Sequence, residues 1–143
     1  MNNKHNRGEG AAIDRLLWEP LNHRLRWPLV GLLVFVAAIH VAELEEHLRE
    51  QPIIGVGFIL LIIACLLIAM AAAVRDTATA YSVAAITGAV AIAGYVFVRT
   101  APIFDLAQEA EAWLEPLGVT ALVTESALIA VALRALTGRP KPG

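Results

Sequence analysis

The sequence contains a run of 22 residues, Ile53 to Val74, without a single charged side chain. A helix rises 1.5 Å per residue, so about 20 residues cross the ~30 Å hydrocarbon core of a bilayer. The run therefore predicts a transmembrane helix. Hydrophobic residues make up 58% of the whole chain, whereas soluble domains contain roughly 45–50%. We expect an integral membrane protein, with the lipid bilayer as its first partner.

Three further apolar runs complete a set of four predicted spans. They cover residues 28–48, 78–98 and 116–136, in addition to 53–74. The expected fold class is all-α, a four-helix transmembrane bundle within residues 27–137. In the third span small residues recur at every fourth position, which lets a neighbouring helix approach closely. The two rows of small residues are Ala80, Ala84 and Gly88, and Ala85, Ala89 and Ala93.

The remaining segments are predicted to lie outside the bilayer. Residues 1–10 and 138–143 are polar or basic and are expected to form flexible tails. Residues 11–26 carry apolar side chains at helical spacing among charged ones, which predicts an interfacial amphipathic helix. The connection after the third span predicts a second surface helix, acidic in character, because its apolar residues also keep a helical spacing.

The distribution of basic residues predicts the orientation. If both termini lie on one side, nine lysines and arginines share that side and two lie opposite. Because basic residues accumulate on the cytoplasmic side, we expect both termini in the cytoplasm and a multi-pass protein of the bacterial inner (plasma) membrane. The nine are Lys4, Arg7, Arg15, Arg24, Arg26, Arg75, Arg134, Arg139 and Lys141, and the two are Arg49 and Arg99.

Ionisable residues occur inside the first span. Its uncharged part, residues 28–42, is too short to cross the bilayer, so His40 and Glu43 must lie below the membrane surface. His40, Glu43 and His47 are spaced i, i+3 and i+7, which places them along one helix face. An ionisable side chain at membrane depth costs roughly 2.5 kcal/mol or more unless it finds a partner or water, so the default interpretation is functional.

Glu125 is the buried acid of the fourth span. His40 lies about seven residues, and Glu125 about eight, below the predicted outer end of its span. The first and last helices of an up-and-down bundle are commonly neighbours, so we expect these side chains to meet in an outward-facing pocket. Arg99 and Asp105 would lie higher, at its mouth. The candidate metal- or proton-binding residues are His40, Glu43, His47 and Glu125.

Two kinds of cation binding fit this set. Two imidazoles and a carboxylate, completed by Glu125 or Asp105, suit a divalent transition metal such as zinc, copper, nickel or iron. However, His40 and His47 lie ~10.5 Å apart along the helix axis, so only one can easily share an ion with a single carboxylate. Buried His and Glu are also the usual groups of proton relays and transporters, for which four spans would require a homo-oligomer. Haem would need one histidine from each of two copies.

A structural role is the alternative. His40, Glu43, Arg99 and Glu125 would then form a hydrogen-bonded knot that fixes how the helices assemble, each polar contact contributing roughly 0.6–2 kcal/mol. The protein would be a non-enzymatic accessory or scaffold subunit of a larger membrane complex. Enzyme activity is left open but is the less expected alternative, because the sequence shows no group of candidate nucleophiles. Ser82 and Ser126 are isolated in apolar runs, and Cys65 has the environment of a small buried hydrophobe. The net charge of −2 excludes a general affinity for nucleic acid.

The segment from residue 40 to 58, HVAELEEHLREQPIIGVGF, resembles small uncharacterised four-span integral membrane proteins of high-GC bacteria. In those proteins a His/Glu motif closes the first span and a Pro-x-x-Gly-x-x-Phe pattern opens the second. The resemblance covers most of residues 28–136, and it implies a four-helix membrane fold without an established activity. The matching residues are Pro52, Gly55 and Phe58, then Arg99 and Thr100 after the third span, and Glu125 in the fourth.

Overall fold

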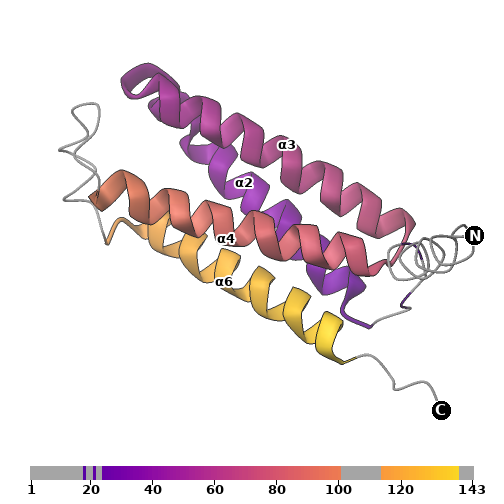
Figure 1. The fold of residues 1–143 in the computed structure, drawn as a ribbon. Helices are drawn as coiled ribbons and strands as arrows, with labels where there is room; N and C mark the ends of the chain where they lie inside the picture. The colour runs from indigo at the N-terminus through magenta and orange to yellow at the C-terminus, as the bar shows by residue number, and fades with distance from the viewer. Residues whose placement is uncertain (1–17, 19–20, 22–23, 101–113, 139–143) are drawn as a thin grey trace, which may run out of the picture.

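The computed structural model describes Trp18, Leu21 and the ranges 24–100 and 114–138. These residues form no strand and fold into four helices, each long and apolar enough to cross a membrane. The predicted all-α four-helix bundle is therefore confirmed, and each helix end lies within two residues of the predicted span. The helices in Figure 1 are α2 (Arg26–Glu50), α3 (Pro52–Val74), α4 (Ala78–Thr100) and α6 (Pro116–Thr137).

Several predicted segments lie outside the described residues. They include the N-terminal tail, nearly all of the interfacial helix predicted for residues 11–26, and most of the acidic surface helix predicted after the third span. Asp105 falls in the same undescribed part of the chain. The predictions for these segments stay predictions.

Proline residues set where two of the helices begin. Pro52 starts α3 directly after Gln51, whose backbone N–H donates to the His47 carbonyl oxygen at 2.8 Å and so closes the end of α2. Pro116 starts α6 in the same way. Proline suits the first helical turn because its missing N–H has no partner there in any helix. The single residue Gln51 therefore reverses the chain between α2 and α3.

Each helix packs mainly against two others, so that the four helices form a ring. α2 contacts α3 and α6, and α4 contacts α6 and α3. The predicted proximity of the first and last helices is thus confirmed. The contact between α3 and α4 is the sparsest of the four, although a short turn joins these helices. Their ribbons diverge as they leave that turn (Figure 1).

The hydrophobic core occupies one half of the bundle, which we call the closed end. It comprises the start of α2, the end of α3, the start of α4 and the end of α6. Many core residues are alanines, and the predicted small-residue row Ala80, Ala84 and Gly88 is buried. The other half, from the α2–α3 turn at Gln51 to the start of α6, is the open end. The core residues include Leu29, Leu33, Val36, Cys65, Ala72, Tyr81, Ala84, Leu128 and Ala132.

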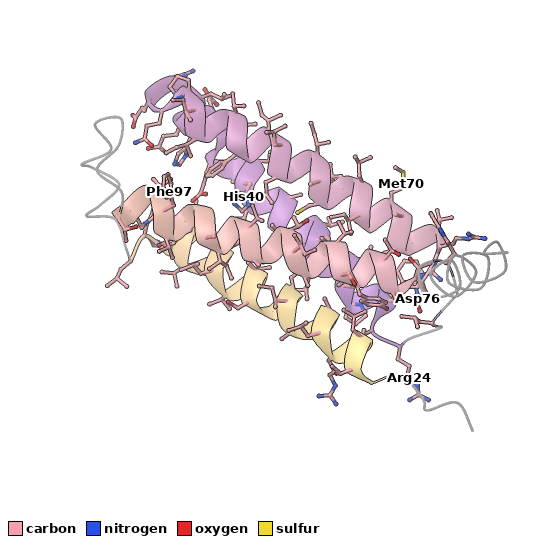
Figure 2. The ribbon with its side chains drawn as sticks, in the orientation of Figure 1. Arg24, His40, Met70, Asp76 and Phe97 are labelled. Atoms are coloured by element: carbon pink, nitrogen blue, oxygen red, sulfur yellow. The ribbon has the colours of Figure 1, made fainter. Side chains whose placement is uncertain are left out.

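Polar side chains are also buried at the closed end. Asp76 and Tyr81 are 4% and 0% exposed, and Tyr81 interacts electrostatically with Asp76 and Arg26. The backbone N–H of Leu21 donates to the Asp76 carbonyl oxygen at 2.7 Å. Figure 2 places Asp76 far along the bundle from His40. These contacts hold the α3–α4 turn against the start of α2, so the helices of this half stay tightly packed.

Large apolar side chains cover the outside of the bundle. Leu60, Met70, Ile86 and Val123 are each more than half exposed, and Figure 2 shows Met70 pointing away from the neighbouring helices. A soluble protein rarely exposes so much contiguous apolar surface. In a membrane these side chains face acyl chains, so the outer surface agrees with four transmembrane helices.

Candidate functional site

His40 of α2 and Glu125 of α6 meet in the interior of the bundle. His40 is 5% and Glu125 2% exposed, and the His40 Nε2 atom lies 3.6 Å from the Glu125 Oε1 atom. Figure 2 shows the position of His40 among the helices. Glu125 lies nine residues after Pro116, or ~13 Å along the axis of α6. The contact expected between the first and fourth spans is therefore present.

The hydrogen bond of the other imidazole nitrogen defines the chemistry of this pair. The Nδ1 atom of His40 lies 2.9 Å from the Val36 carbonyl oxygen, which can only accept, so Nδ1 carries a hydrogen and donates it. In the neutral ring Nε2 is then an acceptor, and an ionised Glu125 is an acceptor as well. Two acceptors approach each other favourably only when one of them holds a proton. The geometry is therefore compatible with a proton on either Nε2 or the carboxyl group.

His47 is kept apart from this pair by Phe58 of α3. Its Nδ1 atom also donates to the carbonyl oxygen four residues earlier, that of Glu43, at 2.9 Å. The Phe58 ring centroid lies 4.8 Å from that of His40 and 4.7 Å from that of His47. One aromatic ring thus contacts both imidazoles. This packing prevents a single ion from bridging the two histidines, which are already two helical turns apart.

Glu43 is the third buried ionisable group near the pair. It is 8% exposed and interacts electrostatically with Glu125, as does the buried Cys65 from the core side. Even so, within residues 24–100 and 114–138 no three His, Cys, Asp or Glu side chains form a group that could hold a metal ion. The predicted set of four is thus brought to one region, but the described residues do not assemble a metal centre.

A pocket of about 740 Å³ opens beside these side chains. Its walls come mainly from α3 and α4, where those helices diverge, and they are apolar. Its floor is formed by His40, Glu43 and His47 of α2 and Glu125 of α6. The volume falls within the ~300–1,000 Å³ typical of ligand sites, which are also mostly apolar with a few polar groups. The polar residues predicted from the sequence therefore line a cavity large enough for a small molecule.

Arg99 lines the pocket at the open end, near the end of α4. Its guanidinium carbon lies 3.5 Å from the centroid of the Tyr95 ring, the distance of a cation–π contact. Gly118 of α6 packs against both, because a Cβ atom there would lie 3.0 Å from Tyr95 Cε2 and 3.4 Å from Arg99 Nη2. The position of Asp105, the other residue predicted at the mouth, lies outside the described residues.

The aromatic and glycine residues that shape the site were not among the site residues predicted from the sequence. Pro52, Gly55 and Phe58 share one face of α3 because they are spaced three residues apart. A Cβ atom on Gly55 would lie 2.7 Å from Leu48 Cδ2, so glycine is what allows α3 to approach α2 closely enough for Phe58 to reach the imidazoles. The Pro-x-x-Gly-x-x-Phe spacing marks these residues in the sequence. By itself it indicates a resemblance to other proteins and does not reveal how the residues pack.

Comparisons with known proteins add no assignment. No family model, no curated protein and no solved structure matches the chain. The resemblance to small four-span proteins of high-GC bacteria stays a prediction.

Proposed function

We propose that this protein binds a proton within the bacterial inner membrane, on the His40–Glu125 pair at the floor of its pocket. The observation that carries the proposal is the approach of two acceptor atoms, His40 Nε2 and Glu125 Oε1, to 3.6 Å with both side chains buried. The hydrogen bond from His40 Nδ1 to Val36 leaves only Nε2 to face the carboxyl group. A proton is the smallest ligand that makes this contact favourable.

The net charge of the pair explains why it favours one bound proton. With one proton, the pair is either two neutral groups or an imidazolium beside a carboxylate, and its net charge is zero in both cases. Without a proton, or with two, the pair carries a full charge. An uncompensated charge is expensive in a medium of low dielectric constant. The pair therefore keeps one proton over a range of pH, and a charge that enters its surroundings changes the pH at which this proton is lost.

A proton fits this site better than a divalent metal. A transition metal would need three or four ligands at about 2.0–2.2 Å, and the described residues offer no such group. Phe58 also fills the space between His40 and His47 that a shared ion would use. The metal alternative therefore has less support than the proton alternative.

The proposed orientation places the pocket on the outer side of the membrane. Nine of the eleven basic residues fall on the side of the termini, which predicts cytoplasmic termini. The pocket lies in the opposite half, the open end, and the closed end is sealed by the alanine-rich core. Passage of protons across the whole bilayer would thus require a second copy of the chain or a larger assembly.

A structural role for the pair is the second candidate function. The His40–Glu125 contact joins α2 to α6, and an interhelical polar contact in a membrane contributes roughly 0.6–2 kcal/mol. In this case the protein is an accessory or scaffold subunit, and the pair specifies only how its helices assemble. The two candidates differ in whether the pair gains and loses a proton in the native protein.

Infrared difference spectroscopy during a pH titration of the purified full-length protein tests the proposal. We expect a carbonyl stretching band of a protonated carboxylic acid that changes with pH and disappears in the Glu125→Gln variant. Glu46→Gln is the matched control, because Glu46 is an exposed acid of α2 that does not line the pocket. This control should keep the band.

Two results would contradict the proposal. One is a wild-type protein whose buried carboxyl groups give no pH-dependent band over the range in which it stays folded. The other is a Glu125→Gln variant with an unchanged spectrum. Either result, together with loss of a co-purifying partner in the variant, would favour the structural role.

A further inference from the structure

We propose that the pocket binds a hydrophobic organic cation, which enters from the bilayer and displaces the proton of the His40–Glu125 pair. The inference rests on the proposed proton site and assigns the ligand class of the same pocket. It follows from three features of the described residues: the sign of the charges that line the pocket, the chemistry of its walls, and the side on which it opens.

The charged residues that line the pocket are mostly acidic. Four carboxyl groups face one guanidinium, that of Arg99, which is stacked on Tyr95. Two of the acids, Glu43 and Glu125, are buried, and the other two are exposed. A ligand of complementary charge is therefore a cation, because an anion would meet an excess of like charge. The four acids are Glu43, Glu50, Glu115 and Glu125.

The walls of the pocket require a ligand with a large apolar body. They present aliphatic side chains together with the aromatic rings of Phe58, Tyr95 and Phe97. Aromatic faces attract organic cations, which are weakly hydrated, by their negative quadrupole. A small inorganic cation would leave these walls without a partner, and the described residues form no metal-binding group. The pocket volume of about 740 Å³ is large enough for a drug-sized cation.

The rim of the pocket faces the lipid. Leu60 of α3 and Val90 of α4 both line the pocket, and each is 64% exposed on the apolar outer surface. The opening between these helices therefore faces acyl chains rather than only water. A hydrophobic cation that partitions into the bilayer can reach the acidic floor sideways, between α3 and α4.

Charge balance couples the binding of the cation to the release of the proton. Once a monovalent cation lies beside Glu125, the pair is neutralised by the ligand and no longer needs its proton. The O–H or Nε2–H bond breaks, the electron pair stays on the protein, and the proton passes to water. Among the described residues, the other ionisable groups around the pocket are Glu43, His47 and Glu50 of α2, Cys65 of α3, Tyr95 and Arg99 of α4, and Glu115 before α6.

Titration calorimetry of the full-length protein in detergent with tetraphenylphosphonium tests this inference. We expect binding that weakens as the pH falls, with release of about one proton per cation, counted by repeating the titration in buffers of different ionisation enthalpy. Glu125→Gln should weaken binding roughly tenfold or more, because it removes the counter-charge. Glu46→Gln, outside the pocket, should bind as the wild type does.

The outcomes separate this inference from the proposed function. If the infrared titration detects the proton of Glu125 but tetraphenylphosphonium does not bind, the inference is wrong and the proton site stands. Equal binding of uncharged triphenylphosphine would also overturn it, since the walls alone would then select the ligand. Binding without proton release would do the same. Helix content by circular dichroism and a Glu125→Asp variant, which should retain binding, guard against a misfolded Glu125→Gln protein.

Discussion

At the scale of single residues, the orientation of one imidazole decides the chemistry. The His40 Nδ1 atom donates to the Val36 carbonyl oxygen at 2.9 Å, which turns Nε2 toward Glu125. The same i to i−4 hydrogen bond occurs at His47, and the Phe58 ring contacts both imidazoles. Two histidines on one helix face thus share the same backbone contact. In the described residues, His40 also has a buried acid of another helix, Glu125, 3.6 Å from its Nε2 atom.

A double-mutant cycle measures the strength of this contact. We expect His40→Ala and Glu125→Ala each to lower the free energy of unfolding, with a coupling energy of about 0.6–2 kcal/mol between them. The measurement is unfolding of the detergent-solubilised protein in increasing denaturing surfactant. The exposed ion pair of Glu45 and Arg49, with a 2.6 Å contact, is the control and should couple weakly. A coupling energy of zero between His40 and Glu125 would contradict the contact.

At the scale of helices, two glycines determine how closely the elements of the site approach. Gly55 brings α3 onto α2 at Leu48, and Gly88 brings α4 onto α6, where a Cβ atom would lie 3.3 Å from the Glu125 carbonyl oxygen. The first approach places Phe58 against the histidines. The second fixes the part of α6 that carries the buried acid. Close approach of backbones at small residues is the usual way in which helices associate in lipid.

Substitution of Gly55 tests the first approach. Gly55→Val should lower the free energy of unfolding by about 1–3 kcal/mol, because its side chain would overlap Leu48 and push α3 outward. Gly57→Val is the matched control, since a Cβ atom at Gly57 meets nothing within 4 Å. Surfactant unfolding of both variants provides the comparison. Equal stability of the two proteins would show that α3 does not pack on α2 in this way.

Substitution of Gly88 tests the second approach. Gly88→Ala would place a Cβ atom 3.0 Å from Ile129 Cγ1, so we expect a loss of stability of up to about 1 kcal/mol despite the better helix propensity of alanine. Gly94→Ala has open space around the added carbon and should be neutral or stabilising. The same unfolding assay applies. A stabilised Gly88→Ala protein would contradict the close packing of α4 on α6.

The helix boundaries could be predicted from the sequence, because hydropathy and span length fix where a chain enters and leaves a bilayer. The meeting of His40 and Glu125 could also be predicted, since both lie at a similar depth on neighbouring helices. The roles of Phe58, Gly55 and Gly118 could not. Uniformly apolar helices such as α3 carry no periodic signal that identifies the face turned toward a partner helix.

At the scale of the whole molecule, the bundle is closed at one end and open at the other. Alanines and the contacts of Asp76 and Tyr81 hold the closed end together. At the open end α3 and α4 diverge around the pocket (Figure 1). This asymmetry was not evident in the sequence, because the small residues of α4 form two rows and only the packed structure distinguishes them. Ala80, Ala84 and Gly88 are buried, whereas Ala89 and Ala93 are exposed.

Labelling of single cysteines tests the proposed orientation of the molecule. In a Cys65→Ala background, Glu46→Cys at the open end should react with a membrane-impermeant maleimide added to intact cells. Gly138→Cys, just after α6, should react only after the membrane is opened, because basic residues favour cytoplasmic termini. Native Cys65 is fully buried and is replaced only to remove background. The reverse pattern of labelling would place the pocket on the cytoplasmic side.

The most direct test of a proton shared by His40 and Glu125 is the ¹⁵N spectrum of the His40 ring in the membrane-embedded protein as a function of pH. We expect Nδ1 to keep its hydrogen throughout, because it donates to Val36. We also expect the titration of Nε2 to be coupled to the carboxyl group of Glu125 and to shift in the Glu125→Gln variant. An Nε2 atom that titrates identically in both proteins, or an Nδ1 atom without hydrogen, would contradict a shared proton.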